Sequence, residues 1–171
     1  MSIEVRVARP EEYPALAELT VAAYAALPGM GPLGAYGEEL ADLAGRGPGA
    51  VVLVALDDGV PVGDVTYYRR YADAMGSLAG LLGDLAGFRM LATAPQAQGR
   101  GVGAALTTAC IERARAEGAP GITLHTTDLM QAAQRLYRRL GFERWTALDV
   151  TYGRTRPVQV VGYRMDFGPS T

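Results

Sequence analysis

The segment from residue 88 to residue 103 constrains the fold of this chain more than any other. It begins with an apolar run typical of a buried strand, passes through a turn with Gly99, Gly101 and Gly103, and leads into a helix that ends at Gly118. Glycines in such a turn leave backbone N–H groups uncovered, and the helix dipole adds positive potential at its N-terminus. The segment therefore predicts an anion-binding cradle between a strand and a helix.

The basic residues of the chain are all arginines. The sequence holds 16 basic residues, and none of them is Lys. A phosphate-binding Walker loop, a Schiff-base lysine and a lysine general base are therefore excluded. A Gly-x-Gly-x-x-Ala variant of the dinucleotide fingerprint fits from Gly99 to Ala104, but it lies in mid-chain with no βαβ unit opening before it. The remaining pattern is Gln98-x-x-Gly101-x-Gly103.

Length and composition predict one globular domain over residues 1–171. Hydrophobic residues make up 49% and charged residues 20% of the chain, which excludes disordered and fibrous classes. A net charge of −2 argues against a general nucleic-acid binder, which needs a basic stripe. No run reaches the ~18 apolar residues of a membrane span, and the N-terminus is strand-like rather than a signal peptide. We expect a cytoplasmic protein that binds neither nucleic acid nor membrane.

Hydrophobic periodicity predicts a mixed α/β fold with one sheet. The expected strands cover residues 3–8, 51–56, 60–69, 88–93, 122–125, 144–152 and 158–167, and the expected helices cover residues 10–27, 38–43, 102–117 and 128–140. Asp128 is expected to cap the last helix, and a turn at residues 153–157 joins the last two strands. Residues 71–87 fit either a loop or a short helix over the sheet.

This order of elements, together with two motifs, resembles the GNAT superfamily of N-acetyltransferases. One motif is the glycine-rich loop, and the other is the helix ending Leu136-Tyr137-x-x-x-Gly141-Phe142. The likeness is strong over residues 85–150 and extends in element order over the whole chain. It implies a twisted, mostly antiparallel sheet of about seven strands flanked by about four helices, with a splay between the fourth and fifth strands.

The resemblance also implies an activity. A member of this superfamily transfers an acetyl group from acetyl-CoA, its cosubstrate, directly to a primary amine of a small molecule or a protein, without a metal. The alternative is a non-catalytic sensor that binds acetyl-CoA or CoA with the same fold. A homodimer through the C-terminal strands is common in this superfamily and is expected here.

The implied cofactor site follows the strand, the loop and the helix. Backbone groups of residues 91–93 would pair with the pantetheine arm at the splay, and N–H groups of residues 98–103 would hold the pyrophosphate. The family often has Asn where Met130 stands, so Met130 would pack against the pantetheine. The implied cofactor-binding residues are Leu91, Ala92, Thr93, Gln98, Gly99, Arg100, Gly101, Val102, Gly103, Ala104 and Met130.

Two residues are implied or proposed as catalytic. Tyr137 would lie beside the thioester sulfur and stabilise the leaving thiolate by a hydrogen bond, because full proton transfer from a phenol to a thiolate is uphill by about 2 kcal/mol. His125, the only histidine, lies at the end of a strand that would flank the splay, and its ordinary pKa suits a general base. Asp64, Asp128 and a water chain without a dedicated base are the alternatives.

The sequence leaves the acceptor open. Aromatic rings together with a few acids would suit a cationic amine, whereas Arg69, Arg70 and Arg89 suit an acceptor with a carboxylate. Residues 31–37 and 71–87 are expected to form the walls of the acceptor site. The tyrosines considered for its lining are Tyr24, Tyr36, Tyr67, Tyr68 and Tyr71.

Overall fold

A single mixed sheet organises the computed structural model, which describes residues 2–152 and 157–169. The strands are β1 (Ile3–Val7), β2 (Ala50–Asp57), β3 (Val60–Tyr68), β4 (Ala86–Thr93), β5 (Gly121–Thr127), β6 (Glu143–Arg144), β7 (Val150–Tyr152) and β8 (Val158–Asp166). They lie in the order β1-β2-β3-β4-β5-β8-β6, and β7 also pairs with β8. All neighbours are antiparallel except β4 and β5, which are parallel.

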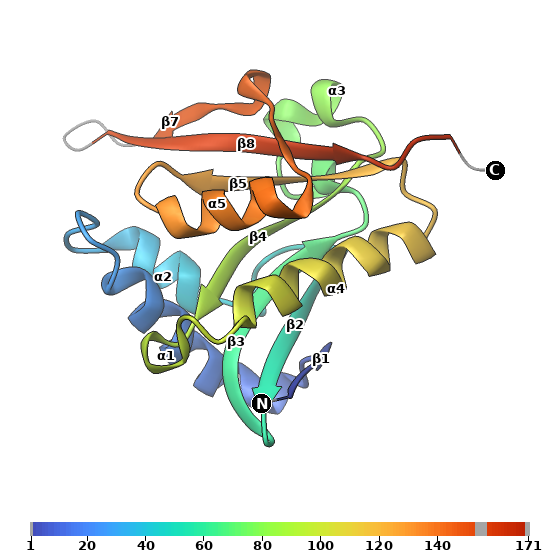
Figure 1. Cartoon of the computed structure of the whole chain (residues 1–171). Helices are drawn as coiled ribbons and strands as arrows, with labels where there is room; N and C mark the ends of the chain where they lie inside the picture. Colours follow the sequence, from blue (N-terminus) through green and yellow to red (C-terminus); the bar gives the residue numbers. More distant parts are fainter. Residues whose placement is uncertain (1, 153–156, 170–171) are drawn as a thin grey trace.

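Helices cover both faces of this sheet, as Figure 1 shows. They are α1 (Tyr13–Ala25), α2 (Ala35–Ala41), α3 (Ala79–Leu82), α4 (Val102–Ala116) and α5 (Gln131–Leu140), with short 3-10 turns η1 (Pro10–Glu12), η2 (Tyr71–Asp73), η3 (Gly76–Leu78), η4 (Pro95–Ala97) and η5 (Thr146–Leu148). α4 and α5 pack on one face, and α1 and α2 pack on the other. The mixed α/β fold predicted from the sequence is confirmed.

β2 shows why its sequence is an unbroken apolar run. Val52 and Val54 pack into the core beneath α1, whereas Leu53 and Ala55 pack into the core beneath α4. A strand that is covered on both faces needs apolar side chains at every position. Because successive side chains of β2 pack into cores on opposite faces of the sheet, β2 lies in the middle layer of a three-layer structure.

β4 contains a bulge where it pairs with β3. Asp64 of β3 pairs with Ala92 of β4, and Thr66 pairs with Arg89. These two pairs are two residues apart along β3 but three residues apart along β4, so β4 holds one extra residue. The extra residue lies at Met90, whose φ is +56°. A bulge of this kind bends the strand and locally increases its twist.

The pairing between β4 and β5 ends just before this bulge. It covers only residues 86–88 of β4 against residues 122–124 of β5. Beyond Phe88 and Leu124 the two halves of the sheet diverge, and Figure 1 shows β5 and β8 running in a different direction from β1–β4. The predicted splay between the fourth and fifth strands is confirmed.

Three expectations about local structure are wrong. α2 covers residues 35–41 rather than 38–43. Asp128 does not cap α5, because the helix begins only after Met130 and the Asp128 carbonyl accepts a hydrogen bond from the Gln131 side chain. The predicted strand at residues 144–152 is interrupted by η5.

Packing against β8 explains this interruption. η5 turns the fully buried Leu148 into the core, where it lies against Gly162 of β8 so closely that a Cβ atom there would clash with it. The Trp145 N–H group donates to the Gly162 carbonyl at 2.9 Å as the chain leaves β6. Residues 71–87, for which the sequence fitted either a loop or a short helix, form η2, η3, α3 and the start of β4. The turn predicted at residues 153–157 lies mostly at 153–156, outside the described residues.

Gly63 of β3 allows α4 to lie close to the sheet, and it provides a test of this packing. A Cβ atom at Gly63 would lie 2.7 Å from both the Ala92 carbonyl oxygen and Val102 Cγ1. We expect Gly63→Ala to lower the free energy of unfolding by about 1–3 kcal/mol, because neither neighbour is a flexible side-chain end. Urea denaturation measures this change.

Gly80→Ala is the matched control, since a Cβ atom at this position in α3 meets nothing within 4 Å. It should leave stability unchanged or raise it by about 0.5–1 kcal/mol through the lower entropy of the unfolded chain. Equal effects of the two substitutions would contradict the close packing of α4 at Gly63.

Candidate functional site

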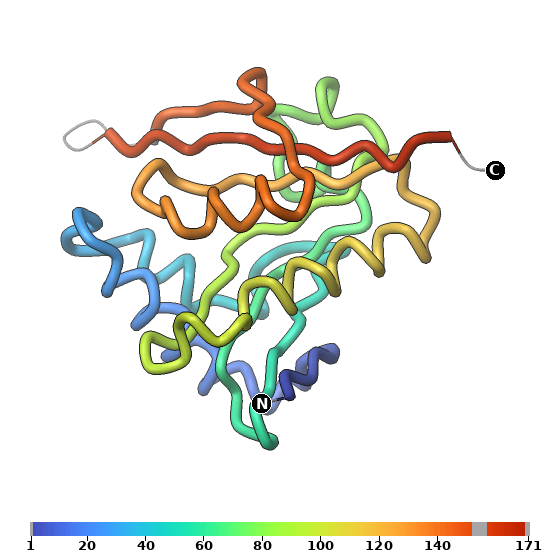
Figure 2. The backbone as a smooth tube through the Cα atoms, in the orientation of Figure 1, coloured from blue at the N-terminus to red at the C-terminus, as the bar shows by residue number. Residues whose placement is uncertain are grey.

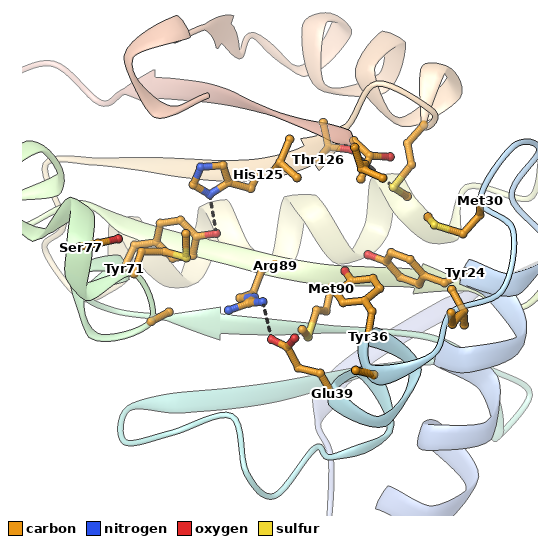
Figure 3. Close-up of a pocket in the computed structure, with 18 of the residues that line it drawn as sticks. Tyr24, Met30, Tyr36, Glu39, Tyr71, Ser77, Arg89, Met90, His125 and Thr126 are labelled. Carbon is orange, nitrogen blue, oxygen red and sulfur yellow. Dashed lines mark hydrogen bonds and ion pairs between the residues drawn. The ribbon is translucent and has the colours of Figure 1, made fainter. Parts of the chain in front are cut away.

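A cavity of about 660 Å³ opens where the two halves of the sheet part. This volume lies within the range of small-molecule sites. Figure 3 shows side chains from both halves of the sheet pointing into it. The lining residues are Tyr24, Met30, Pro32, Leu33, Ala35, Tyr36, Glu39, Tyr71, Ala74, Met75, Gly76, Ser77, Arg89, Met90, His125, Thr126, Thr127, Met130, Val158 and Val160. The predicted wall segments 31–37 and 71–87 both contribute to this lining.

The bulge explains why two consecutive residues of β4 reach this cavity. Arg89 and Met90 both line it, although neighbouring side chains of a regular strand point to opposite faces. In a bulge two residues oppose a single partner, so both side chains can lie on the same side. The positive φ of Met90 is therefore part of the geometry that brings Arg89 into the cavity.

The hydrogen bonds of β4 toward β3 define the direction of its backbone groups. The Ala94 N–H group donates to the Val62 carbonyl at 2.9 Å, and Ala92 pairs with Asp64. Residues 92 and 94 therefore direct their backbone groups toward β3. Since these directions alternate along a strand, the intervening residue directs its groups the opposite way.

The opposite edge of β4 is open at the splay. By this alternation, the Leu91 carbonyl and both backbone groups of Thr93 face the edge that pairing with β5 leaves free beyond Phe88. Ala92 was predicted to bind the cofactor with them, but its backbone groups face β3 instead. The open edge can pair with an extended ligand that carries amide groups.

The glycine-rich loop follows this edge and begins α4. Gly99 and Gly101 have φ values of +79° and +83°, and a Cβ atom on either would meet nothing within 4 Å. Gly101 precedes the first turn of α4, and no side chain of the described residues caps that helix. Figure 2 shows the chain reversing here, so that α4 leads back across the sheet. Uncapped N–H groups at a helix N-terminus fit a phosphate group.

The other loop residues differ in how they could contribute. The Gln98 N–H group is directed at the Pro95 carbonyl, at 3.5 Å. Arg100 Nη1 lies 3.7 Å from Asp57 Oδ2, so its charge is shared with a carboxylate at the end of β2. Gly103 packs against Leu136 of α5, which joins the start of α4 to the neighbouring helix.

Tyr137 lies at the apex of the splay. Its ring packs edge-on against Phe88, the last β4 residue paired with β5, with the ring centroids 5.9 Å apart, and it also contacts Phe142 and Tyr163. Burial raises the pKa of Tyr137 far above its usual value, so the hydroxyl stays protonated. Among the described residues this hydroxyl has no hydrogen-bond partner, and it can donate to a ligand.

His125 lines the cavity, but both of its ring nitrogens already have partners. Nε2 lies 2.9 Å from the Leu148 carbonyl, which can only accept, so Nε2 carries the proton. Nδ1 then accepts a hydrogen bond from the Tyr71 hydroxyl at 3.1 Å, drawn as a dashed line in Figure 3. Burial, together with the charge of Arg89, lowers the pKa of His125, so the ring is neutral. Neither nitrogen presents a free lone pair to the cavity.

The two rival acids are not part of the cavity lining. Asp128 is exposed at the turn before α5. Asp64 is fully buried under α1, where its Oδ2 accepts a hydrogen bond from Thr20 at 2.7 Å and its Oδ1 has no partner among the described residues. Burial raises the pKa of Asp64 to about 7, against the opposing effects of Thr20 and the nearby Arg46.

Only some of the arginines and tyrosines that the sequence suggested for the acceptor site line the cavity. Arg89 lines it, whereas Arg69 and Arg70 pair with Asp84 outside it. Tyr24, Tyr36 and Tyr71 line it, and Tyr67 and Tyr68 do not. Sequence reasoning missed Glu39, whose carboxylate lies 3.2 Å from Arg89, because nothing in a short helix of mixed composition distinguishes it.

The open edge of β4 leads to the uncapped N-terminus of α4 and lies beside the cavity. This geometry is suited to an extended ligand that carries a phosphate group. A model of the acetyltransferase (GNAT) family matches residues 14–142. The chain belongs to this family. Across the described residues, no group of His, Cys, Asp and Glu is arranged to hold a metal ion, and no helix is long and apolar enough to span a membrane.

Curated relatives match one segment of the chain. A mycothiol acetyltransferase of Arthrobacter sp. is 49% identical over 59 residues, which cover 34% of this chain and 18% of the relative. The same enzyme of Thermobispora bispora is 43% identical over 60 residues, 35% of this chain and 20% of the relative. The match thus spans only about a fifth of these relatives.

Solved structures share the fold over nearly the whole chain. An acetyltransferase of the GNAT family from Staphylococcus aureus superposes with a TM-score of 0.74 at 14% identity, covering 98% of this chain and all of that one. A ribosomal-protein-alanine N-acetyltransferase from Brucella melitensis has a TM-score of 0.69 at 20% identity, covering 96% and 99%. A protein of Salmonella typhimurium, solved with acetyl-CoA as its cofactor, has a TM-score of 0.69 at 18% identity, covering 99% and 96%.

The buried carboxyl group of Asp64 predicts a pH dependence of stability. Its pKa in the folded protein, about 7, is higher than that of an aspartate in the unfolded chain, about 4. Folding therefore takes up a proton between pH 4 and 7, and stability falls as the pH rises through this window. Relative to Asp64→Asn, the wild type should lose about 4 kcal/mol of unfolding free energy between pH 4 and 8.

Urea denaturation of both proteins across this pH range measures the difference. Other carboxylates titrate equally in the two proteins, so they cancel in the comparison. Stability curves that run parallel from pH 4 to 8 would show that Asp64 has an ordinary pKa.

Proposed function

We propose that the chain is an acetyl-CoA-dependent N-acetyltransferase that transfers the acetyl group directly to a primary amine. The observation that carries this proposal is the continuity between the open edge of β4 and the uncapped N-terminus of α4. A pantetheine arm carries amides that can pair with Leu91 and Thr93, and its pyrophosphate then reaches the loop at residues 98–103. Bound acetyl-CoA supplies an activated acyl group at the apex of the splay.

The cavity favours an enzyme over a sensor. A protein that only detects acetyl-CoA needs no second binding space, whereas here a cavity of about 660 Å³ adjoins the proposed cofactor path. The relatives also support transfer to an acceptor, since all those described above are named as acetyltransferases or were solved with acetyl-CoA. Location in the cytoplasm and assembly as a homodimer stay predictions from the sequence.

The chemistry needs little from the chain beyond positioning. The amine nitrogen forms a bond to the acyl carbon, the carbon–sulfur bond breaks, the nitrogen loses a proton and the thiolate gains one. Correct alignment alone supplies up to about 7–11 kcal/mol of such a barrier. We propose that the Tyr137 hydroxyl donates a hydrogen bond to the leaving sulfur, because its raised pKa makes it a donor rather than a proton source.

The proton acceptor is proposed to be His125 or water in the cavity. His125 is neutral, but its Nδ1 is available only when the Tyr71 hydroxyl turns away from it. Met130, at the start of α5, borders the cavity and accepts a hydrogen bond from Thr126 at its sulfur, so it is proposed to pack beside the pantetheine. No metal is required in this scheme.

A charge at the start of α4 tests the proposed pyrophosphate site. Ala104 is the third residue of the helix, and Ala104→Glu should preserve or raise stability because acidic residues interact favourably with a helix N-terminus. The same carboxylate repels the pyrophosphate and competes for its N–H groups. We expect at least a tenfold loss of acetyl-CoA affinity by calorimetric titration.

Thr108→Glu is the matched control, since Thr108 is exposed one turn further along α4 and receives the same charge. It should change the affinity much less, because solvent screens the added charge and no N–H group of the first turn is blocked. Equal affinity of the Ala104→Glu variant and the wild type would refute the proposed cofactor site.

A further inference from the structure

The charged side chains that border the cavity form one pair of opposite sign. Arg89 comes from β4 and Glu39 from α2, and Arg89 Nη2 lies 3.2 Å from Glu39 Oε1. Figure 3 shows this pair inside the ring of lining residues, with Tyr36 and Tyr71 on either side. Among the described lining residues there is no other Asp, Glu or Arg, and His125 is neutral.

Arg89 has hydrogen-bonding capacity that the chain leaves unused. Its Nη2 contact with Glu39 is the only hydrogen bond that it makes among the described residues, and this contact is single rather than the two-point fork that Arg and a carboxylate can form. The Arg89 side chain is 25% exposed and that of Glu39 is 56% exposed. The pair is partly exposed and its contact is single, so a ligand can share or replace it.

The remaining wall of the cavity is mainly apolar and adaptable. Met30, Met75, Met90 and Met130 come from four different segments and all border it. Thioether side chains are flexible and polarisable, and they fit apolar groups of varied shape. A ligand in this cavity therefore meets one cation, one anion and an apolar surface.

From this arrangement we propose that the acceptor is a free α-amino acid, or a close analogue, with an apolar side chain. The carboxylate binds Arg89, the amine lies beside Glu39, and the side chain packs among the methionines. An amine and a carboxylate on one carbon match the short separation of the Arg89–Glu39 pair. The inference rests on the proposed function, and it narrows the amine acceptor to one class.

The same charges disfavour the other common amine acceptors. A polyamine or a lysine side chain brings positive charge toward Arg89 and offers it no anion. The N-terminal residue of a protein carries an amide where a free amino acid carries its carboxylate, so it offers the guanidinium a neutral carbonyl oxygen in place of an anion. A hydrogen bond from a guanidinium to a neutral carbonyl is weaker than one to a carboxylate, so such an acceptor binds less tightly than a free amino acid.

A comparison of acids with their amides tests the proposal. Purified protein with acetyl-CoA is offered L-leucine, L-methionine and L-phenylalanine and, in parallel, the amide of each, and thiol release is measured. We expect the acids to have KM values about 10- to 100-fold lower than the amides, which corresponds to the loss of a charge-assisted hydrogen bond. Arg89→Met should abolish this preference while leaving the KM for acetyl-CoA within about twofold.

Arg70→Met is the control for this substitution. Arg70 lies outside the cavity and its side chain is 58% exposed, and within the described part of the chain its one ion pair is a 3.9 Å contact with Asp84. This variant should keep the wild-type preference for acids over amides. Equal loss of preference in both variants would point to a general effect of removing positive charge and would overturn the assignment of Arg89.

Binding of a carboxylate without an amine separates this inference from the proposed function. 4-Methylpentanoate, which is leucine without its amine, should bind the wild type but not Arg89→Met in calorimetric titrations with CoA present. Amides used as well as acids, with no binding of 4-methylpentanoate, would overturn the inference and leave the N-acetyltransferase intact. Binding of 4-methylpentanoate with no transfer to any amine would instead refute the proposed function and retain the carboxylate site.

Discussion

The parting of β4 and β5 after three residue pairs is the constraint on which the site depends. Up to Phe88 the two strands are hydrogen-bonded like any parallel pair, and immediately afterward the bulge at Met90 turns β4 away. A non-glycine residue at positive φ costs on the order of 1–3 kcal/mol, which the surrounding structure must offset. Met90 is almost fully buried among Ala23, Tyr24 and Leu40, and this packing holds the bulge in place.

The divergence of β4 and β5 makes room for both proposed ligands, the cofactor and the acceptor. On one side, the free edge of β4 leads to the start of α4, where a nucleotide-linked arm can bind through backbone groups. On the other side, residues from α1, α2, η2 and η3 enclose the cavity in which an acceptor can approach the apex. Tyr137 packs against Phe88 at this apex, so the residue that ends strand pairing also positions the proposed donor to the sulfur.

Local chemistry made much of this structure predictable from the sequence. The apolar run of β2 requires cover on both faces, and the glycines before α4 require an open turn, so these elements follow from residue types alone. Packing between distant segments was harder to predict. The predicted strand at residues 144–152 breaks because Leu148 fits beside Gly162, and α5 begins after Met130 although Asp128 is the better capping residue.

In the site, too, features set by local sequence could be predicted, and features set by contacts between distant segments could not. Tyr137 and the proposed cofactor loop lie in motifs with fixed spacing, so the sequence alone could single them out. The sequence offered no way to choose among Arg69, Arg70 and Arg89, because Arg89 lines the cavity through a one-residue bulge, whereas the other two pair with Asp84 outside it. For His125, the engagement of both ring nitrogens depends on Leu148 and Tyr71, which are far away in the sequence.

Arg89 brings positive charge into the cavity without bringing a nucleophile. A guanidinium stays protonated at any physiological pH, whereas a lysine at the same position would offer a primary amine to the thioester. Because the chain contains no lysine at all, none of its side chains presents an amine that could compete with the acceptor. In the proposed reaction the protein therefore cannot acetylate itself on lysine, the side chain whose amine most resembles that of the acceptor.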